Sequence, residues 1–175
     1  SMVRVRGNDI HDVGPRSAHI AGLHYAAFAK PEDIVEPRLE LFRPKDGDPD
    51  DYLAVRCSNG ERYALTNTCA ANILGYAKPG WHAHGNAESA RRAFAPLAER
   101  MGSSIEEAAR RVLVKAAAKV TGVVEDLIRE YKLDRDQAVL IGEGGGAAAL
   151  IPFVAETMKL DFKISQDAEV ISSIG

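Results

Sequence analysis

A glycine-rich turn between an apolar segment and a helix-forming segment holds the residues best suited to bind a ligand. The turn contains Gly142, Glu143, Gly144, Gly145 and Gly146. Glycine has no Cβ, so its backbone can approach a ligand closely. Residues 138–141 are apolar and predict a short buried strand, and residues 147–160 predict a helix. The first-turn amides of that helix would point back at the turn, so the segment predicts a seat for an anion or a nucleotide.

The same turn satisfies the dinucleotide-binding pattern G-x-G-x-x-G/A, with Gly142, Gly144 and Ala147 at its fixed positions. That pattern requires an acidic residue about 20 positions later, after the second strand, to hold the ribose. Asp161 lies near that distance, but it precedes the strand predicted at residues 162–164. A dinucleotide-binding oxidoreductase therefore remains an alternative hypothesis. A non-catalytic assembly subunit, in which the glycines serve packing alone, is a second alternative.

A second polar group follows the turn that Gly14-Pro15 predicts. Ser17 is placed to cap a helix running to about Ala29, because its hydroxyl can accept from a free amide. Arg16, Ser17 and His19 are therefore candidate contacts for an anion. A surface loop followed by a capped helix explains the same residues without a ligand.

Two histidines, His82 and His84, are weak candidates for a metal site. In an extended backbone both imidazoles would lie on one face, which is a beginning of metal coordination. The neighbouring sequence offers no third ligand, so we expect no metal at this pair.

The composition restricts the class of protein. The chain is 46% hydrophobic and 27% charged, as in ordinary globular proteins. A net charge of −3 without a basic cluster argues against nucleic-acid binding, and no apolar run is long enough to cross a membrane. The two cysteines, Cys57 and Cys69, suit a reducing compartment, so we expect a cytoplasmic protein.

Local patterns predict a mixed α/β fold. Asn59-Gly60 between two β-prone runs predicts a hairpin, and Ser104 with Glu107 forms a capping box that opens a long amphipathic helix. Asn86 predicts the start of another helix, which Pro96 should kink or divide. The expected strands cover residues 3–6, 38–42, 52–56, 62–66, 138–141 and 162–164, and the expected helices cover 17–29, 69–74, 87–101, 105–131 and 147–160.

These elements predict a single α/β domain or lobe over residues 3–175. Residues 1–2 look like the remnant of a cleaved tag, and we leave them out of the predicted fold. Residues 168–175 begin an apolar pattern that the chain does not continue. We therefore expect a piece excised from a longer protein.

Three segments, in this order, resemble the ATP-dependent hydantoinase/5-oxoprolinase family (A-type subunit). The first is Gly14-Pro-Arg-Ser-Ala18, similar to the family's G-P-x-S-A. The second is Thr66-x-Thr68-x-Ala70 with Ile73-Leu-Gly75, similar to T-x-T-D-A-N-x-x-L-G. The third begins at Met101-Gly-x-Ser-Ile-Glu-Glu-Ala-Ala109, passes Gly144-Gly145 and Pro152, and ends on Val170-Ile-Ser-Ser-Ile-Gly175.

This resemblance implies part of an actin-like ATPase lobe (ribonuclease H-like) that carries the hairpin as an insertion. It also implies a parent enzyme that uses ATP, with Mg²⁺, to open cyclic amides such as hydantoin or 5-oxoproline. Gly144-Gly145 would correspond to the glycine pair that receives adenosine, and Glu143 could accept from a ribose hydroxyl. The implied partners are the rest of the parent chain, a small-molecule substrate and a B-type subunit.

The chain departs from the family pattern at several positions. The family's G-G-A-G-P-L-H reads here as Gly144-Gly-Gly-Ala-Ala-Ala-Leu150, and Cys69 and Ala71 replace an aspartate and an asparagine. The D-x-G-G-T-[ST] phosphate loops are missing from the sequence. Phosphoryl transfer depends on such positioned donors and on metal, so we expect the chain alone to be inactive.

Overall fold

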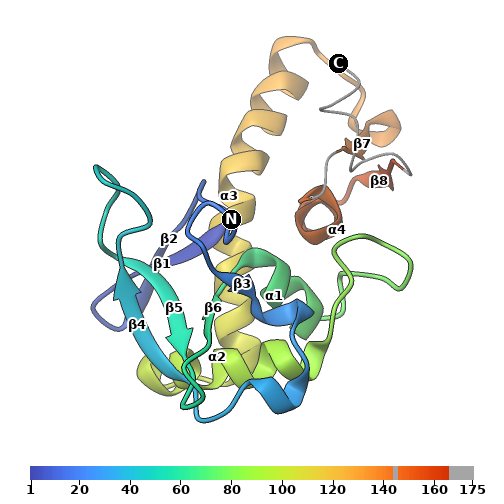
Figure 1. The fold of residues 1–175 in the computed structure, drawn as a ribbon. Helices are drawn as coiled ribbons and strands as arrows, with labels where there is room; N and C mark the ends of the chain where they lie inside the picture. Colours follow the sequence, from blue (N-terminus) through green and yellow to red (C-terminus); the bar gives the residue numbers. More distant parts are fainter. Residues whose placement is uncertain (144–145, 166–175) are drawn as a thin grey trace.

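A computed structural model describes residues 1–143 and 146–165, which form a six-stranded sheet, three helices beside it and a smaller β–α–β unit (Figure 1). The strands are β1 (Met2–Arg6), β2 (Asp9–Gly14), β3 (His24–Tyr25), β4 (Arg38–Phe42), β5 (Tyr52–Arg56), β6 (Arg62–Ala64), β7 (Val139–Gly142) and β8 (Asp161–Ile164). The helices are α1 (Asn67–Ile73), α2 (Ala87–Met101), α3 (Ile105–Glu130) and α4 (Ala147–Met158), with short 3-10 turns η1 (Ala26–Phe28), η2 (Pro31–Asp33) and η3 (Arg135–Gln137).

The predicted hairpin forms the middle of the six-stranded sheet. The sheet order is β2-β1-β5-β6-β3, β4 also pairs with β5, and β3 pairs parallel to β6. Gly60 has a φ of +90°, which glycine adopts readily in a tight turn. Leu53, Ala54 and Val55 are fully buried. The hairpin prediction is confirmed, but its description as an insertion is wrong because these strands hold the sheet together.

Residues 17–29 do not form the predicted helix. The Ser17 hydroxyl accepts from the amide of Ile20 at 3.4 Å, but the turn ends at Gly22, where φ is +67°. The chain then extends into β3 and pairs with β6 before entering η1. Pairing with a strand distant in sequence overrides the local helix signal.

Helix α3 is the longest element and packs against α1, α2, β2 and α4. The Ser104 hydroxyl accepts from the amide of Glu107 at 3.1 Å, which confirms the predicted cap. Its buried residues are four alanines, together with one valine and one leucine: Ala108, Ala109, Ala116, Ala117, Val112 and Leu113. Small side chains let neighbouring helices approach closely, so α3 serves as the common support of the fold.

Helix α2 runs unbroken through Pro96, so the expected division of this helix is wrong. A proline inside a helix removes one backbone hydrogen bond. Here Phe94 and Leu97 are fully buried on either side of Pro96. Their burial stabilises the helix through the interruption.

Strands β7 and β8 are parallel and are joined by α4, which confirms the predicted strand–turn–helix–strand order. The expectation that residues 138–141 form a buried strand is wrong. Val139 is 44% exposed and Ile141 is 63% exposed. Within the described ranges, β7 has only β8 as a strand neighbour. Among the described residues, the better covered side of this small sheet is the one that packs on α4.

Helix α4 joins the β–α–β unit to the rest of the molecule, and it contacts both α1 and α3. Phe153 packs edge-on against Tyr76, with ring centroids 5.4 Å apart. The Tyr76 hydroxyl donates a hydrogen bond to the Glu156 carboxylate. Trp81 packs in the same manner on Phe162 of β8. Apolar packing and one polar contact thus fix the unit beside α1.

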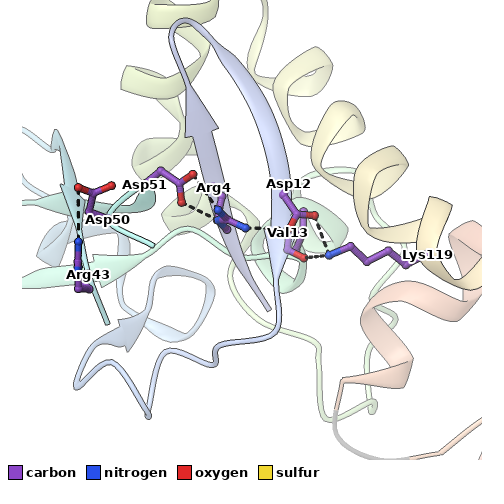
Figure 2. A network of polar contacts seen from close by, with 7 residues as sticks. All are labelled: Arg4, Asp12, Val13, Arg43, Asp50, Asp51 and Lys119. Carbon is purple, nitrogen blue, oxygen red and sulfur yellow. Dashed lines mark hydrogen bonds and ion pairs between the residues drawn. The ribbon is translucent and has the colours of Figure 1, made fainter. Parts of the chain in front are cut away.

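A network of charged side chains ties the sheet to α3 (Figure 2). The Arg4 guanidinium donates to both carboxylate oxygens of Asp51, at 2.6 and 2.9 Å, and to Asp12 at 3.3 Å. The Lys119 ammonium of α3 lies 2.7 Å from Asp12 and donates to the Val13 carbonyl at 2.8 Å. The network therefore links β1, β2, the start of β5 and α3.

Residue Met2 belongs to the fold. It is fully buried in β1, and its amide donates to the Arg16 carbonyl at 3.1 Å. Leaving this residue out of the predicted fold was therefore a mistake. That residues 1–2 are a tag remnant stays a prediction.

No helix in the described part of the chain is both long and apolar enough to cross a membrane.

Asp51→Asn should lower the free energy of unfolding by about 1–3 kcal/mol near neutral pH, because it removes a charged partner of the largely buried Arg4. The Arg4 hydrogen bonds hold the pKa of Asp51 below its ordinary value. The stabilisation is therefore present above about pH 4 and is lost as the pH falls further. Urea unfolding at pH 7 and at about pH 3 measures both effects.

Asp50→Asn is the matched control, because Asp50 is 81% exposed and lies 3.8 Å from Arg43. We expect this variant to unfold like the wild type. Equal losses for both variants at pH 7, or a difference that does not shrink at low pH, would contradict the role given to Asp51.

Candidate functional site

A cavity of about 1140 Å³ lies between two parts of the molecule. One is the six-stranded sheet with α1, α2, α3 and their loops, here called the six-stranded part, and the other is the β–α–β unit. The volume of the cavity is slightly above the range of about 300–1,000 Å³ that is typical of small-molecule sites. The six-stranded part contributes Ser1, His19, His24, Tyr25, Phe28, Ala29, Asp33, Asn59, Glu61, Tyr63, Asn67, Thr68, His82 and Ala83. The β–α–β unit contributes Ile141, Gly142, Glu143, Gly146, Ala147, Leu150 and Ile151.

The cavity brings together several of the residues that the sequence singles out. Gly142, Glu143 and Gly146 line it, and so do His19 and His82 from distant parts of the chain. The glycine turn therefore faces a space large enough for a ligand. Gly144 and Gly145, the predicted adenosine contacts, lie outside the described residues.

The structure does not bring Arg16, Ser17 or His84 to this cavity. The Arg16 guanidinium donates to both oxygens of Asp48, at 2.8 and 2.7 Å. This pairing holds the pKa of Asp48 below its ordinary value. Arg16 thus stabilises the loop before β5, whereas the Ser17 hydroxyl serves the turn to Ile20.

The segment that carries His82 and His84 is a tight turn, in which the His84 amide donates to the Trp81 carbonyl at 3.0 Å. The extended backbone that would place both imidazoles on one face is therefore not formed. His84 Nδ1 lies 3.0 Å from the Ala77 carbonyl. Among the described residues, no group of three or more His, Cys, Asp or Glu side chains could hold a metal ion.

The two described glycines of the turn differ in their surroundings. A Cβ on Gly142 would lie 2.8 Å from Ile164 Cδ1 and 3.1 Å from Ala147 Cβ. A Cβ on Gly146 would meet no atom of the described residues within 4 Å. A side chain at position 142 would therefore force neighbouring side chains, Ile164 first, to shift. An added Cβ at position 146 would displace none of the described residues.

The N-terminus of α4 adds to this open surface. Gly146 is the N-cap residue and, as a glycine, offers no side-chain cap. The amide groups at a helix start have no partner inside the helix and carry partial positive charge. Ala147, the first helical residue, lines the cavity. Backbone amides at the start of α4 therefore lie at the edge of the cavity, where they could donate hydrogen bonds to a ligand oxygen.

The ionisable side chains that line the cavity include acidic and imidazole groups, and the N-terminal ammonium of Ser1 lies beside them, bonded to Asn67 Oδ1 at 3.1 Å. Asp33, Glu61 and Glu143 line it together with three histidines, and none of its described lining residues is a lysine or an arginine. Burial raises the pKa of Tyr63, so its hydroxyl stays protonated. The cavity suits an uncharged polar ligand group better than a highly charged anion.

The sequence alone did not predict most of the cavity-lining residues that the six-stranded part contributes. Tyr25 and Phe28 lie in the stretch that was predicted as a helix, so no site was expected there. Tyr63 was assigned only to the hairpin. Asn67 and Thr68 could have been predicted as site residues from the sequence, because they lie in the segment Thr66-x-Thr68-x-Ala70 that resembles a known family.

The hydantoinase/oxoprolinase family model matches residues 1–175. The chain therefore belongs to the hydantoinase/oxoprolinase family, which confirms the family that its three ordered segments resemble. No curated protein matches the chain.

The loop beside the cavity depends on the buried Asn72 of α1. Its Nδ2 donates to the carbonyls of Thr68 and Ala83, at 2.9 and 2.8 Å, and its Oδ1 accepts from the Gly85 amide at 2.7 Å. Asn72→Ala would leave buried backbone groups without these partners. We expect a loss of about 1–3 kcal/mol in unfolding free energy, measured by urea denaturation.

Asn59→Ala provides a control on an exposed hairpin turn, where the side chain donates to the Asp33 carbonyl at 3.0 Å and accepts from the Glu61 amide at 3.1 Å. Water can replace exposed hydrogen bonds, so its loss should be smaller. Faster amide exchange at residues 81–85 should accompany Asn72→Ala alone. A variant as stable as Asn59→Ala, with unchanged exchange, would show that Asn72 does not fix the loop.

Proposed function

We propose that this chain supplies the adenosine-binding side of an ATP-dependent hydrolase that opens cyclic amides of the hydantoin or 5-oxoproline type. Membership of the hydantoinase/oxoprolinase family supports the reaction class. The ligand assignment rests on one observation: the glycine turn and the six-stranded part line the same cavity. The parent enzyme would use ATP to activate the cyclic amide for ring opening.

The side chains of the cavity favour adenosine over the phosphates as the bound group. A triphosphate needs metal ions or fixed cations around it. The described lining offers carboxylates, imidazoles and two phenols in their place. Glu143 could accept from a ribose hydroxyl, and the open backbone at Gly146 gives a flat group room to approach. The phosphates and Mg²⁺ would then be bound by other parts of the parent protein.

The arrangement of β7, α4 and β8 supports the proposal of an actin-like ATPase lobe. The glycine turn follows the carboxyl end of a parallel strand, where ligands of open α/β sheets bind. We further propose that the rest of the parent chain and a B-type subunit are its partners and supply the catalytic groups. The buried free thiols of Cys57 and Cys69 agree with the proposed cytoplasmic location.

A dinucleotide site is less well supported by the geometry. Gly142 pairs with Ile164, whereas Asp161 pairs with Val139 at the opposite end of the two strands. A carboxylate at that end is in the wrong place to hold a ribose beside the glycine turn. The assembly-subunit alternative retains one supporting observation, since a Cβ at Gly142 would be crowded by the Ile164, Ala147 and Ile151 side chains.

Calorimetric titration of the parent protein with ATP, adenosine and NAD tests the proposal. We expect ATP and adenosine to bind and NAD to bind much more weakly. An absence of ATP binding, or preferential NAD binding at residues 142–147, would rule out the proposed function.

Alanine substitutions at the two described glycines separate ligand binding from packing. Gly146→Ala should leave the thermal stability unchanged and weaken adenosine binding, because the added methyl group occupies open space beside the ligand. Gly142→Ala should lower the melting temperature through the contacts with Ile164 and Ala147. Calorimetry and thermal unfolding of both variants measure the difference.

If Gly146→Ala changes neither stability nor affinity while Gly142→Ala destabilises the protein, the turn serves packing alone. That outcome would favour the assembly-subunit alternative.

A further inference from the structure

We propose that His19, Tyr25 and Phe28 form an aromatic surface on which the flat base of the bound nucleotide stacks; this inference rests on the proposed function. The ring centroids of His19 and Tyr25 lie 5.4 Å apart, and those of Tyr25 and Phe28 lie 5.7 Å apart. All three residues line the cavity that contains the glycine turn. They form a continuous aromatic group on the wall contributed by the six-stranded part.

Phe28 is the outermost apolar ring of this group and is 52% exposed. An exposed aromatic ring costs free energy that a ligand could recover by covering it. Its neighbours Ala26 and Ala27 in η1 are fully buried. The exposed ring is therefore carried by a well-anchored backbone.

Backbone contacts hold this segment in place. The Asn86 amide donates to the Ala27 carbonyl at 2.7 Å. Gly85 packs so closely that a Cβ there would lie 2.3 Å from the Ala27 oxygen and 3.0 Å from Phe28 Cδ1. The Phe28 ring is thus supported from the loop before α2. A rigid aromatic surface loses little entropy when a ligand binds.

The chemistry of the surface selects a planar heteroaromatic group. Bases stack on aromatic side chains with a contribution of about 1–3 kcal/mol each, largely independent of the base. The acidic lining residues Asp33 and Glu61 would repel phosphate from the same cavity. A base on the aromatic surface, with its ribose toward Glu143, therefore agrees with the charge distribution.

The test compares ligands with and without the base. In the parent protein, Phe28→Ala and Phe28→Leu should weaken ATP and adenosine binding by about 5- to 150-fold. Phe28→Tyr should retain affinity, because an aromatic ring remains. Ribose 5-triphosphate, which lacks the base, should bind all variants equally. Calorimetry measures each affinity.

Tyr131→Ala is the matched control, since Tyr131 is 65% exposed and does not line the cavity. It should bind ATP like the wild type. Phe28→Leu with wild-type affinity, or equal losses for ATP and ribose 5-triphosphate, would overturn the stacking assignment while leaving the proposed function standing. A wild-type parent that binds neither ATP nor adenosine would refute both.

Discussion

The packing of α4 against α1 and α3 is the interaction on which the rest of the structure depends. A two-stranded parallel sheet is too small to be stable alone, and β7 and β8 are largely exposed except toward α4. The apolar side of α4, including the fully buried Val154, therefore anchors the whole β–α–β unit. Because the glycine turn opens directly into α4, the same packing sets the turn on the cavity that His19, Tyr25 and Phe28 also line. Fold stability and site geometry are thus coupled through one helix.

The two glycines show how one short turn meets two demands. Gly142 lets β7, α4 and β8 pack closely, whereas Gly146 leaves open backbone at the helix start. The described residues around the turn include acidic, imidazole and aromatic side chains and neither lysine nor arginine. The proposed division of the ligand, with adenosine here and the phosphates bound elsewhere in the proposed parent protein, rests on these side chains.

Local sequence patterns predicted the elements whose signals are local. The cap at Ser104, the Asn59-Gly60 turn and the β7–α4–β8 order were all found in this way. The helix predicted at residues 17–29 failed because pairing of β3 with β6 is a long-range interaction. The same error hid Tyr25 and Phe28, which reach the site only through that pairing. The glycine turn was identifiable from composition, but its aromatic counterpart required the folded chain.

Photolabelling of the parent protein with 8-azido-ATP tests the central claim most directly. The reactive group sits on the base, so the labelled peptides report where adenosine binds. We expect label, competed by excess ATP, within residues 19–28 and 141–151, the segments that line the cavity from its two sides. Specific labelling confined to other segments would show that adenosine binds elsewhere and would contradict the assignment of this site.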